Sequence, residues 1–512
     1  CALPILEASA LLSQRKIELL KQLPKGDETF YKWFLAITEV ERPSFHLEKA
    51  LETVKEWGTK LGVHYEQDEA GNVIFSIPAT KGFENIPSIV IQGHLDIVAV
   101  GQFDNGKVPV KIVDGKLTSG VSTLGGDDGI AIATMFALME LRDTFNHGPV
   151  EFLITKDEEV GLIGASKLAG PPFMKSKYML NLDSEDWGTI ITSCAGSITI
   201  WYEYDVKREK YDGKKLTLKL TNFMSGHTGL CIQEGRASSL KWAARLLQYA
   251  QRKNIDFRLV RISGGDKHNA IPGFCTIEVV AQEGFEEAVK EEHKDLIREY
   301  KAIEKKVPVL EITETPDIAL PTTFEDTRKI INFISTVFHG VHRYHPEIKD
   351  LVQTSQSFSV LQFEGDKMRA QIYARSNEDS HMDWLMEYNR SFAELAGFKI
   401  SIPEDEIQGP WPAALDSKIL KFTIDVYEEL FHEKPAVNGI HAGLECGCIK
   451  NRGYPDLEAI SLGPDVHGAH TIEETVSIDT ASKCWELTIA LLERWTKQRS
   501  EERRVGKECR SR

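Results

Sequence analysis

The sequence predicts an α/β fold, a mostly parallel sheet with helices on both faces, interrupted by an inserted α+β domain. Short apolar runs alternate with helical segments over the first part of the chain, which is the pattern of βαβ units. Near residue 196 the strands become half-exposed and alternating, and near residue 400 the first pattern returns. At 512 residues the chain is also too long for one core. We therefore expect an α/β domain built from 1–195 and 400–498, and an inserted domain at 196–399.

The first α/β part opens with helical periodicity and continues with hairpins, buried strands and one apolar helix. The turn signals are glycine-containing, as at Asp114-Gly115. In chain order the expected elements are helices within 15–60, a hairpin at 64–78, a strand at 88–98, a hairpin at 109–118, a helix at 127–142 and strands at 150–155 and 178–182.

The insertion contains two comparable sets of α+β elements, separated by the proline-containing stretch 307–321. The first set has strands at 198–206, 216–222, 257–263 and 274–281 and helices at 237–252 and 285–305. The second has helices at 324–338 and 380–396 and strands at 356–364 and 368–376. The repetition predicts a lid domain with two α+β halves.

The final part returns to α/β elements, with helices at 417–431 and 478–496 and a strand at 459–462. The last fourteen residues, 499–512, resemble a translated sequencing-library adapter. We expect them to be a non-native tail and exclude them from the fold.

Composition restricts the classes of partner. The net charge of −16 argues against nucleic acid and anionic membranes. No apolar stretch approaches the roughly 18 residues that suggest a membrane span. The eight cysteines are scattered along the chain, which fits free thiols in a reducing compartment. The expected location is the cytoplasm.

Metal-ligand residue types follow the predicted strands at several separate places. Because open α/β sheets bind ligands at the carboxyl ends of their strands, these side chains are expected to meet in one crevice. Asp127 differs, since it closes a glycine-rich turn that opens a helix. The others are His94 and Asp96 after 88–91, Glu158 and Glu159 after 152–154, Asp183 after 178–180, and His470 beyond 459–462.

Taken singly, each of these features also fits an ordinary structural role. The His94–Asp96 pair could be a satisfied core pair, Asp127 could belong to a plain N-cap turn, and Glu158-Glu159 could be a solvated acidic turn. His467 also competes with His470. An accidental placement of metal-ligand residue types in five separate segments is the less economical explanation. The set as a whole therefore predicts a site for two divalent metal ions. Zinc is expected, with Mn²⁺ and Co²⁺ as the other candidates.

The chemistry that this set supports is hydrolysis by metal-activated water. One of two adjacent carboxylates can bind metal while its neighbour takes a proton from water. The sequence has no G-x-S-x-G elbow for a serine nucleophile and no phosphate-binding G-x-x-x-x-G-K-[ST] loop.

The order of these motifs closely resembles the aminoacyl-histidine dipeptidases, a branch of the co-catalytic zinc peptidases that also include carnosinases and carboxypeptidase G. The resemblance extends from about residue 28 to 497, and the segment H-A-G-L-E-C-G at 441–447 is characteristic of this branch. The matching motifs are H-x-D at 94–96, T-L-G-x-D at 123–127, D-E-E-x-G at 157–161, N-x-D-S-E at 181–185 and A-H at 469–470.

The resemblance implies a role for each of these residues. His94, Asp127 and Asp183 would hold one metal ion. His470, Asp127 and Glu159 would hold the other. Glu158 would act as general base and then general acid, and Asp96 would orient His94. A cis peptide bond is implied between Asp127 and Asp128.

Four residues of the insertion and its neighbourhood would contact the substrate. His227 matches the histidine that stabilises the tetrahedral oxyanion. Asn269 and Gly443 would contact the substrate, and Arg375 would bind its carboxylate, for which a planar guanidinium is suited.

The implied function is hydrolysis of unblocked dipeptides, with Xaa-His as one substrate class. A two-zinc aminopeptidase acting on longer peptides and a catalytically inactive binding protein of the same fold are the alternatives. A homodimer stays open, because dimeric relatives supply the lid histidine across subunits, whereas two lid halves in one chain could supply it internally.

Overall fold

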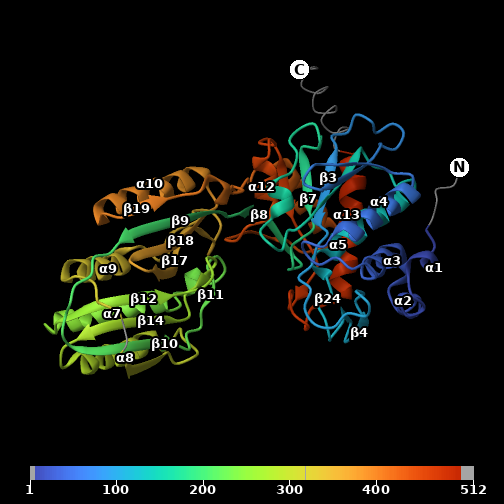
Figure 1. The fold of residues 1–512 in the computed structure, drawn as a ribbon. Coiled ribbons are helices and arrows are strands. Elements are labelled where there is room, and N and C mark those ends of the chain that lie inside the picture. The colour runs from blue at the N-terminus through green and yellow to red at the C-terminus, as the bar shows by residue number, and fades with distance from the viewer. Residues whose placement is uncertain (1–5, 317–318, 498–512) are drawn as a thin grey trace, which may run out of the picture. The chain divides into compact units, whose positions relative to one another are not determined.

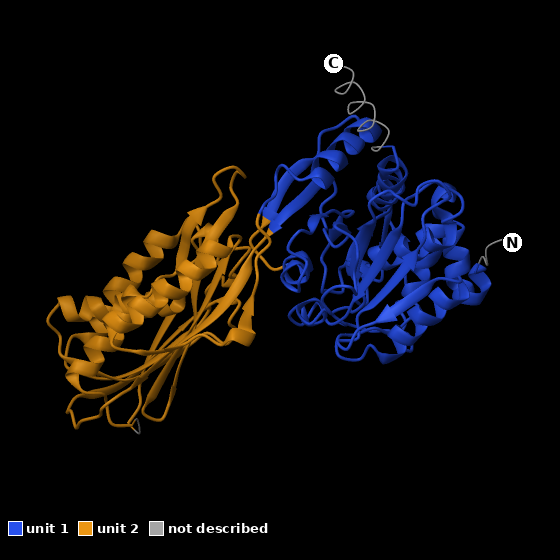
Figure 2. Ribbon diagram, turned by 90° about the horizontal axis from the view of Figure 1, so that it is seen from above, with its two compact units in different colours: residues 1–193, 413–439, 444–512 blue, residues 194–412, 440–443 orange. Residues whose placement is uncertain are grey.

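The computed structural model describes residues 6–316 and 319–497, and the chain forms two compact units (Figures 1 and 2). Unit 1 comprises Cys1–Ser193, Ala413–Gly439 and Leu444–Arg512, and unit 2 comprises Cys194–Pro412 and Ile440–Gly443. The expected tail at 499–512 lies outside the described residues. None of the helices in the described ranges combines the length and apolar character that crossing a membrane requires.

Unit 1 is built on an eight-stranded sheet whose four central strands, β6, β3, β7 and β22, are parallel. The outer ladders β1–β2, β2–β6 and β22–β8 are antiparallel, so the parallel arrangement is limited to the centre of the sheet. In spatial order the strands are β1 (His64–Gln67), β2 (Val73–Ile77), β6 (Val150–Thr155), β3 (Ile89–His94), β7 (Tyr178–Asn181), β22 (Glu458–Ser461), β8 (Thr189–Cys194) and β21 (Ala436–Ile440).

Most helices of unit 1 pack their apolar residues into one large core with this sheet. The helical stretch expected at 15–60 is three separate helices, since the chain leaves the helix between residues 38 and 47 around Pro43. The helices are α1 (Ala8–Leu11), α2 (Gln14–Leu20), α3 (Glu28–Ile37), α4 (Glu48–Lys60), α5 (Gly126–Leu141), α6 (Ile163–Ser166), α11 (Lys418–Phe431), α12 (Glu445–Asn451) and α13 (Ile478–Trp495), with the short 3₁₀ turn Lys25–Asp27.

A small antiparallel sheet in unit 1 brings together residues 111–118 and residues 466–477. It has the order β23 (Val466–His467), β24 (Thr475–Ser477), β5 (Lys116–Thr118) and β4 (Lys111–Val113). Because β24 pairs with β5, the segment carrying His470 is anchored beside the segment that precedes Asp127.

Unit 2 contains a ten-stranded antiparallel sheet with two halves that repeat one strand order. Each half has the chain order β-α-β-β-α-β, and the halves meet where β12 pairs with β17 and α7 contacts α9. The first half is β15 (Val309–Glu314), β10 (Lys214–Thr221), β14 (Cys275–Ala281) and β12 (Phe257–Gly264) with α7 (Ser239–Arg252) and α8 (Phe285–Tyr300). The second is β17 (Val352–Glu364), β18 (Lys367–Ser376), β9 (Gly196–Asp205) and β19 (Lys399–Ser401) with α9 (Phe324–Thr336) and α10 (Asp379–Ala396).

The remaining elements of unit 2 are short. β16 (Gly340–Tyr344) pairs with β17, β20 (Ile407–Gln408) pairs with β9, and β11 (Gly226–His227) pairs with β13 (Ala270–Ile271). Two 3₁₀ turns lie at Ile232–Glu234 and Glu404–Glu406.

Two details of unit 2 differ from the sequence-based assignment. The strand expected at 198–206 was grouped with the first half, but β9 pairs with β18 and β19 of the second half. The first half is therefore inserted between the first strand and first helix of the second. The proline-containing stretch also holds a strand, β15, which escaped prediction because it is a short, largely exposed edge strand.

The unit boundaries lie at 193/194 and 412/413 rather than at 195/196 and 399/400. The segment after residue 399 stays in unit 2 because β19 and β20 both pair with β9. Residues 440–443 also belong to unit 2, where the N–H of Ala195 donates to the carbonyl of Ala442. The predicted α/β class with an α+β insertion is confirmed.

Unit 1 encloses a buried ion pair between α3 and α5, which allows a stability test. Glu140 accepts hydrogen bonds from Lys32 Nζ at 2.6 and 2.7 Å and from Trp33 Nε1 at 2.7 Å. Glu140→Ala would leave the Lys32 ammonium buried without its carboxylate, so we expect a loss of about 3–5 kcal/mol in the free energy of unfolding. Denaturant unfolding followed by tryptophan fluorescence measures it.

The matched control is Glu56→Ala, which removes the exposed i,i+4 partner of Lys60 in α4. That variant should lose less than about 1 kcal/mol. Equal losses in the two variants would refute the importance of the Lys32–Glu140 pair.

Candidate metal centre

The carboxyl ends of three parallel central strands meet at one edge of the unit 1 sheet. β3 ends at His94, which pairs in register with Thr155 at the end of β6. β7 ends at Asn181, two residues before Asp183. The residues that follow these strands are therefore brought together by the parallel register, as the sequence suggested.

Asp127 lies between two imidazoles that come from distant parts of the chain. His94 Nε2 lies 2.9 Å from Asp127 Oδ1, and His470 Nε2 lies 3.1 Å from Asp127 Oδ2. Each oxygen of one carboxylate thus faces a different histidine. The bond between Asp127 and Asp128 is a cis peptide.

Two further carboxylates complete the cluster. Asp183 Oδ1 lies 3.4 Å from His94 Nε2, and Glu159 Oε2 lies 2.8 Å from His470 Nε2. It is His470, and not its neighbour His467, that reaches Asp127 and Glu159. The structure therefore brings together all five residues that the sequence assigned to the metal ions.

Two groups of three ligand atoms lie within 4.8 Å of one another, and they include one unexpected residue. The first is His94, Asp127 and Glu159, and the second is His94, Asp128 and Asp183. Asp128 already uses its oxygens within the protein, because Oδ2 accepts the N–H of His94 and Oδ1 accepts the N–H of Ala131. It therefore supports the start of α5 and the end of β3.

The distribution of charge in the cluster is suited to the binding of cations. Burial would raise the pKa of Asp127, but its contacts with His470 and His94 outweigh burial and hold it far below its usual range. Contacts with Asp127 and then Glu159 raise the pKa of His470 to about 11. Glu159 Oε1 is buried and has no hydrogen-bond partner in the described part of the chain. Buried carboxylates with these ligand types are suited to divalent cations.

The Asp96 carboxylate has a wider role than the sequence indicated. Its Oδ1 lies 3.5 Å from His94 Nδ1, while its backbone carbonyl lies nearer that nitrogen, at 3.1 Å. The carboxylate also accepts the backbone N–H groups of Glu158 at 2.9 Å and Glu159 at 3.2 Å, and the hydroxyl of Ser44 at 2.8 Å. Asp96 therefore holds the segment that carries both glutamates.

Glu158 is placed beside the cluster by a left-handed residue. Asp157 has φ 53°, a left-handed conformation that turns the chain directly after β6 and just before Glu158 and Glu159. Burial raises the pKa of Glu158 well above its usual range; His94 opposes this shift, and Asp183 adds to it. A carboxyl group with a raised pKa accepts and holds a proton more readily than an ordinary glutamate.

The Asp127 loop is anchored by residues that sequence reasoning missed. Glu474 accepts the N–H groups of Leu124 at 2.7 Å, Gly125 at 3.0 Å and Gly126 at 2.7 Å. Buried Arg42 donates to the carbonyl of Gly125 at 2.6 Å. These contacts are to backbone atoms, so no residue pattern in the sequence marks them.

Unit 2 holds a second cluster around His227 and Arg375. The N–H groups of Gly229 and Leu230 donate to His227 Nδ1, each at 3.2 Å, so the proton of the neutral ring is on Nε2. Burial, and then the charge of Arg375, lowers the pKa of His227 to about 4, which keeps the ring neutral. His227 Nε2 lies 3.2 Å from Arg375 Nη2, donor facing donor. An oxygen acceptor would satisfy both groups.

Asn269 and the 440–443 segment lie beside this cluster. The carbonyl of Asn269 accepts the N–H of Thr228 at 2.8 Å, and Thr228 Oγ1 accepts from Arg375 Nε at 3.3 Å. A Cβ at Gly229 would come within 2.1 Å of the His441 carbonyl, so only glycine allows this approach. Gly443 belongs to the same segment.

His441 was treated in the sequence only as part of a motif, yet it is buried in this cluster. Its Nε2 lies 2.7 Å from Ser355 Oγ and its Nδ1 lies 3.1 Å from Asn377 Oδ1. Burial, and then the charge of Arg375, lowers the pKa of His441 to about 3. The ring is therefore a neutral support of the 440–443 segment.

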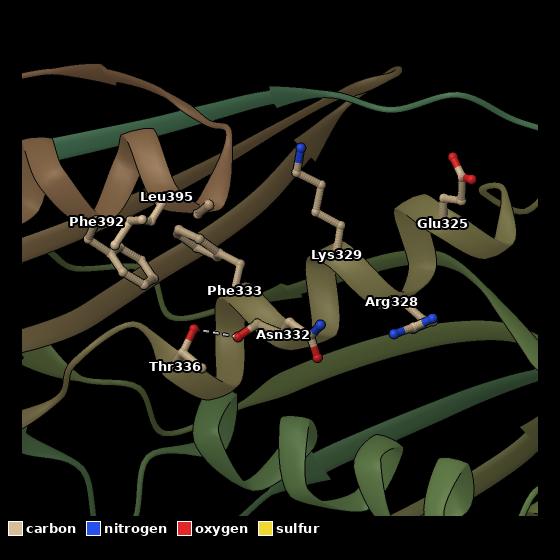
Figure 3. A pocket seen from close by; sticks show the side chains of 9 residues that line it. Glu325, Arg328, Lys329, Asn332, Phe333, Thr336, Phe392 and Leu395 are labelled. Carbon is tan, nitrogen blue, oxygen red and sulfur yellow. Dashed lines mark hydrogen bonds between the residues drawn. The ribbon is translucent and has the colours of Figure 1, made fainter.

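A groove of about 570 Å³ on unit 2 contains none of these residues (Figure 3). It runs between α9 and α10, where Phe333 and Phe392 form its apolar part and Arg328 and Lys329 its charged part. It is separate from both clusters described above.

The fold and the ligand types of the cluster point to a class of protein, the metal-dependent peptidases. Peptidase family M20/M25/M40 matches residues 90–494, and the chain belongs to this family. The family expected from the motifs is confirmed.

Two relatives match the chain over nearly all of its length. The chain is 32% identical over 475 residues to the cytosol non-specific dipeptidase of Escherichia coli K12, covering 90% of this chain and 96% of the relative. It is also similar to the crystal structure of aminoacylhistidine dipeptidase from Vibrio alginolyticus, with a TM-score of 0.82, 31% identity and coverage of 93% and 97%. Aminopeptidase PepT from Bacillus cereus shares the fold at a TM-score of 0.54 and 17% identity, with coverage of 92% and 98%.

The shared position of Asp127 predicts unequal losses of metal. The wild-type protein should retain two divalent ions per chain after dialysis. Asp183→Ala should lose about one, and Asp127→Ala should lose both if its carboxylate serves both sites. Elemental analysis by mass spectrometry measures the ions per chain. The control is Asp143→Ala, at an exposed position of unit 1. Retention of two ions by Asp127→Ala would exclude a shared ligand.

Proposed function

We propose that the protein is a metal-dependent dipeptidase that hydrolyses unblocked dipeptides. The observation that carries the proposal is the Asp127 carboxylate between His94 and His470, with the raised-pKa carboxyl of Glu158 beside it. The E. coli and V. alginolyticus relatives, which the chain matches over nearly their whole length, are both named dipeptidases.

In this proposal His94, Asp127 and Asp183 hold one divalent ion, and His470, Asp127 and Glu159 hold the other. We propose zinc, with Mn²⁺ and Co²⁺ as alternatives, because imidazole and carboxylate suit borderline cations. When bound, such ions would lower the pKa of a water molecule and polarise the peptide carbonyl.

Glu158 would move the proton in both halves of the reaction. As a carboxylate it takes a proton from the attacking water, and as an acid it then delivers that proton to the leaving amine. Asp96 would keep Glu158 in place, because it accepts the Glu158 N–H and contacts the His94 ring at the same time. A fixed position is needed for efficient proton transfer.

Unit 2 would act as a lid that supplies the groups for substrate oxygens. His227 Nε2–H is a neutral donor suited to the oxyanion, and Arg375 is suited to the terminal carboxylate. The two donor atoms, His227 Nε2 and Arg375 Nη2, lie 3.2 Å apart. This approach of two donors supports the binding of an oxygen acceptor at this place. Asn269 and Gly443 would complete the substrate contacts.

The proposed substrate class is a short peptide with a free C-terminal carboxylate. A carboxylate bound by Arg375 would define the C-terminal end and so limit the length of the substrate. One relative is named non-specific and the other is named for aminoacyl-histidine, so we propose a broad range of dipeptides that includes Xaa-His. Action on long peptides is the less favoured alternative.

We also propose a cytoplasmic location. The E. coli relative is named a cytosolic enzyme, and the six cysteines within residues 6–316 and 319–497 are free thiols, as expected in a reducing compartment.

A substrate panel tests the proposal. We expect the zinc-loaded protein to cleave unblocked dipeptides, among them Xaa-His and β-alanyl-histidine, and to leave N-acetylated dipeptides and tetrapeptides intact. Product amines are measured by chromatography, with metal content determined on the same sample. A preparation that holds two ions per chain and cleaves no dipeptide would rule out the proposed function, and efficient tetrapeptide cleavage would favour the aminopeptidase alternative.

Substitution of Glu158 tests its role in proton transfer. We expect Glu158→Gln to keep two metal ions and lose at least about a hundredfold in kcat, because the amide cannot take a proton from water. The control is Glu66→Gln, the same change at an exposed position of strand β1, and it should have wild-type kcat. Near-normal turnover by metal-replete Glu158→Gln would refute the role.

A further inference from the structure

Glu445 is a fully buried carboxylate that none of the roles above uses. It is the first residue of α12 and has an exposed fraction of 0%. Its Oε2 accepts hydrogen bonds from Gln92 Nε2 at 2.5 Å and from Thr155 Oγ1 at 2.6 Å. Its Oε1 is buried and has no hydrogen-bond partner among the described residues. Burying a carboxylate without a cationic partner is costly, so a compensating role is expected.

Gln92 connects Glu445 to two predicted metal ligands. Gln92 precedes His94 by two residues on β3, so both side chains project from the same face of the strand. Gln92 Oε1 accepts from Asn181 Nδ2 at 2.7 Å, and Asn181 Oδ1 accepts the backbone N–H of Asp183 at 3.3 Å. A continuous hydrogen-bond chain therefore runs from Glu445 to the segment that carries Asp183.

Thr155 connects Glu445 to the third strand end. It is the last residue of β6, the register partner of His94 and the third residue before Glu158. Its hydroxyl is 3.3 Å from the carbonyl of Gly93 as well as 2.6 Å from Glu445. One carboxylate thus joins β3, β6 and β7 at the edge where the cluster forms.

The pKa of Glu445 is influenced by residues of the metal cluster, which indicates that Glu445 lies close to the groups proposed to react. Burial raises its pKa to about 7, while His94 opposes the shift and Asp183 adds to it. Glu445 in turn contributes to the raised pKa of Glu158.

We propose that Glu445 is a positioning residue that fixes the carboxyl ends of β3, β6 and β7, so that His94 and Asp183 meet in the geometry that binds metal and Glu158 is held beside them. The inference rests on the proposed metal-dependent function, because Glu445 acts through those residues and contacts no substrate. A carboxylate that served the fold alone would affect stability and leave metal binding unchanged.

The test compares Glu445→Ala with a structural carboxylate in the same sheet. Glu151 lies near the opposite end of β6, is also buried, and accepts the N–H groups of Lys175 and Ser176 and the hydroxyl of Ser176. Glu151→Ala is therefore the matched control. Glu445→Gln keeps an oxygen acceptor for Gln92 and Thr155, and Thr155→Val removes one donor at nearly constant volume.

The readouts are Co²⁺ affinity by competition with a chromophoric chelator, the visible absorption spectrum of the Co²⁺ protein, and the melting temperature of the metal-free protein. We expect Glu445→Ala to lose about tenfold or more in Co²⁺ affinity, in the range known for groups that orient metal ligands, with an altered spectrum. Glu445→Gln should recover most of that affinity, and Thr155→Val should lose affinity in the same direction. Glu151→Ala should melt earlier with wild-type Co²⁺ affinity and spectrum.

Unchanged Co²⁺ affinity and spectrum in Glu445→Ala would overturn the proposal. If that variant does not fold, Thr155→Val decides, and wild-type Co²⁺ binding in it would overturn the proposal equally. Because Co²⁺ binding is measured without substrate, a wild-type protein that binds metal but cleaves no dipeptide would contradict the proposed function and leave this comparison valid.

Discussion

The arrangement of one carboxylate between two imidazoles is the constraint on which the rest of unit 1 depends. Asp127 can face both His94 and His470 only if the segment of His470, 343 residues away in sequence, is held within hydrogen-bond distance of the Asp127 loop. The parallel register of β3, β6 and β7 aligns the strand ends. The pairing of β24 with β5 brings the late histidine to the same place.

This arrangement concentrates negative charge in a buried region. Asp127, Glu158, Glu159 and Asp183 lie around two histidines, and the ion pairs described for Asp127, Glu159 and Asp183 are with those histidines. The protein compensates in part by hydrogen bonds from backbone groups, as at Asp96 and Glu474. The remaining imbalance is what divalent cations would neutralise. The contacts with the two histidines outweigh burial and lower the pKa of Asp127, whereas burial raises the pKa of Glu158.

The sequence could predict the strands and the residues at their ends because both depend on local patterns. Buried parallel strands are short apolar runs, and metal ligands are chemically distinctive types, so His94, Glu159 and Asp183 stood out where their strands ended. The supporting residues could not be found in this way. Glu474 acts on backbone N–H groups, and Glu445 acts on side chains from two strands and through Gln92 on a third, so their roles exist only after the fold has formed. The edge strand β15 was missed because it is short and largely exposed, so only Leu310 and Ile312 mark its inner face.

The most direct measurement of the central claim is anomalous diffraction from crystals of the zinc-loaded protein, with data on both sides of the zinc absorption edge. The account predicts two peaks about 3.5–4 Å apart, one next to each oxygen of Asp127, with His94 at one peak and His470 at the other. A single peak, or two peaks that do not share Asp127, would contradict it.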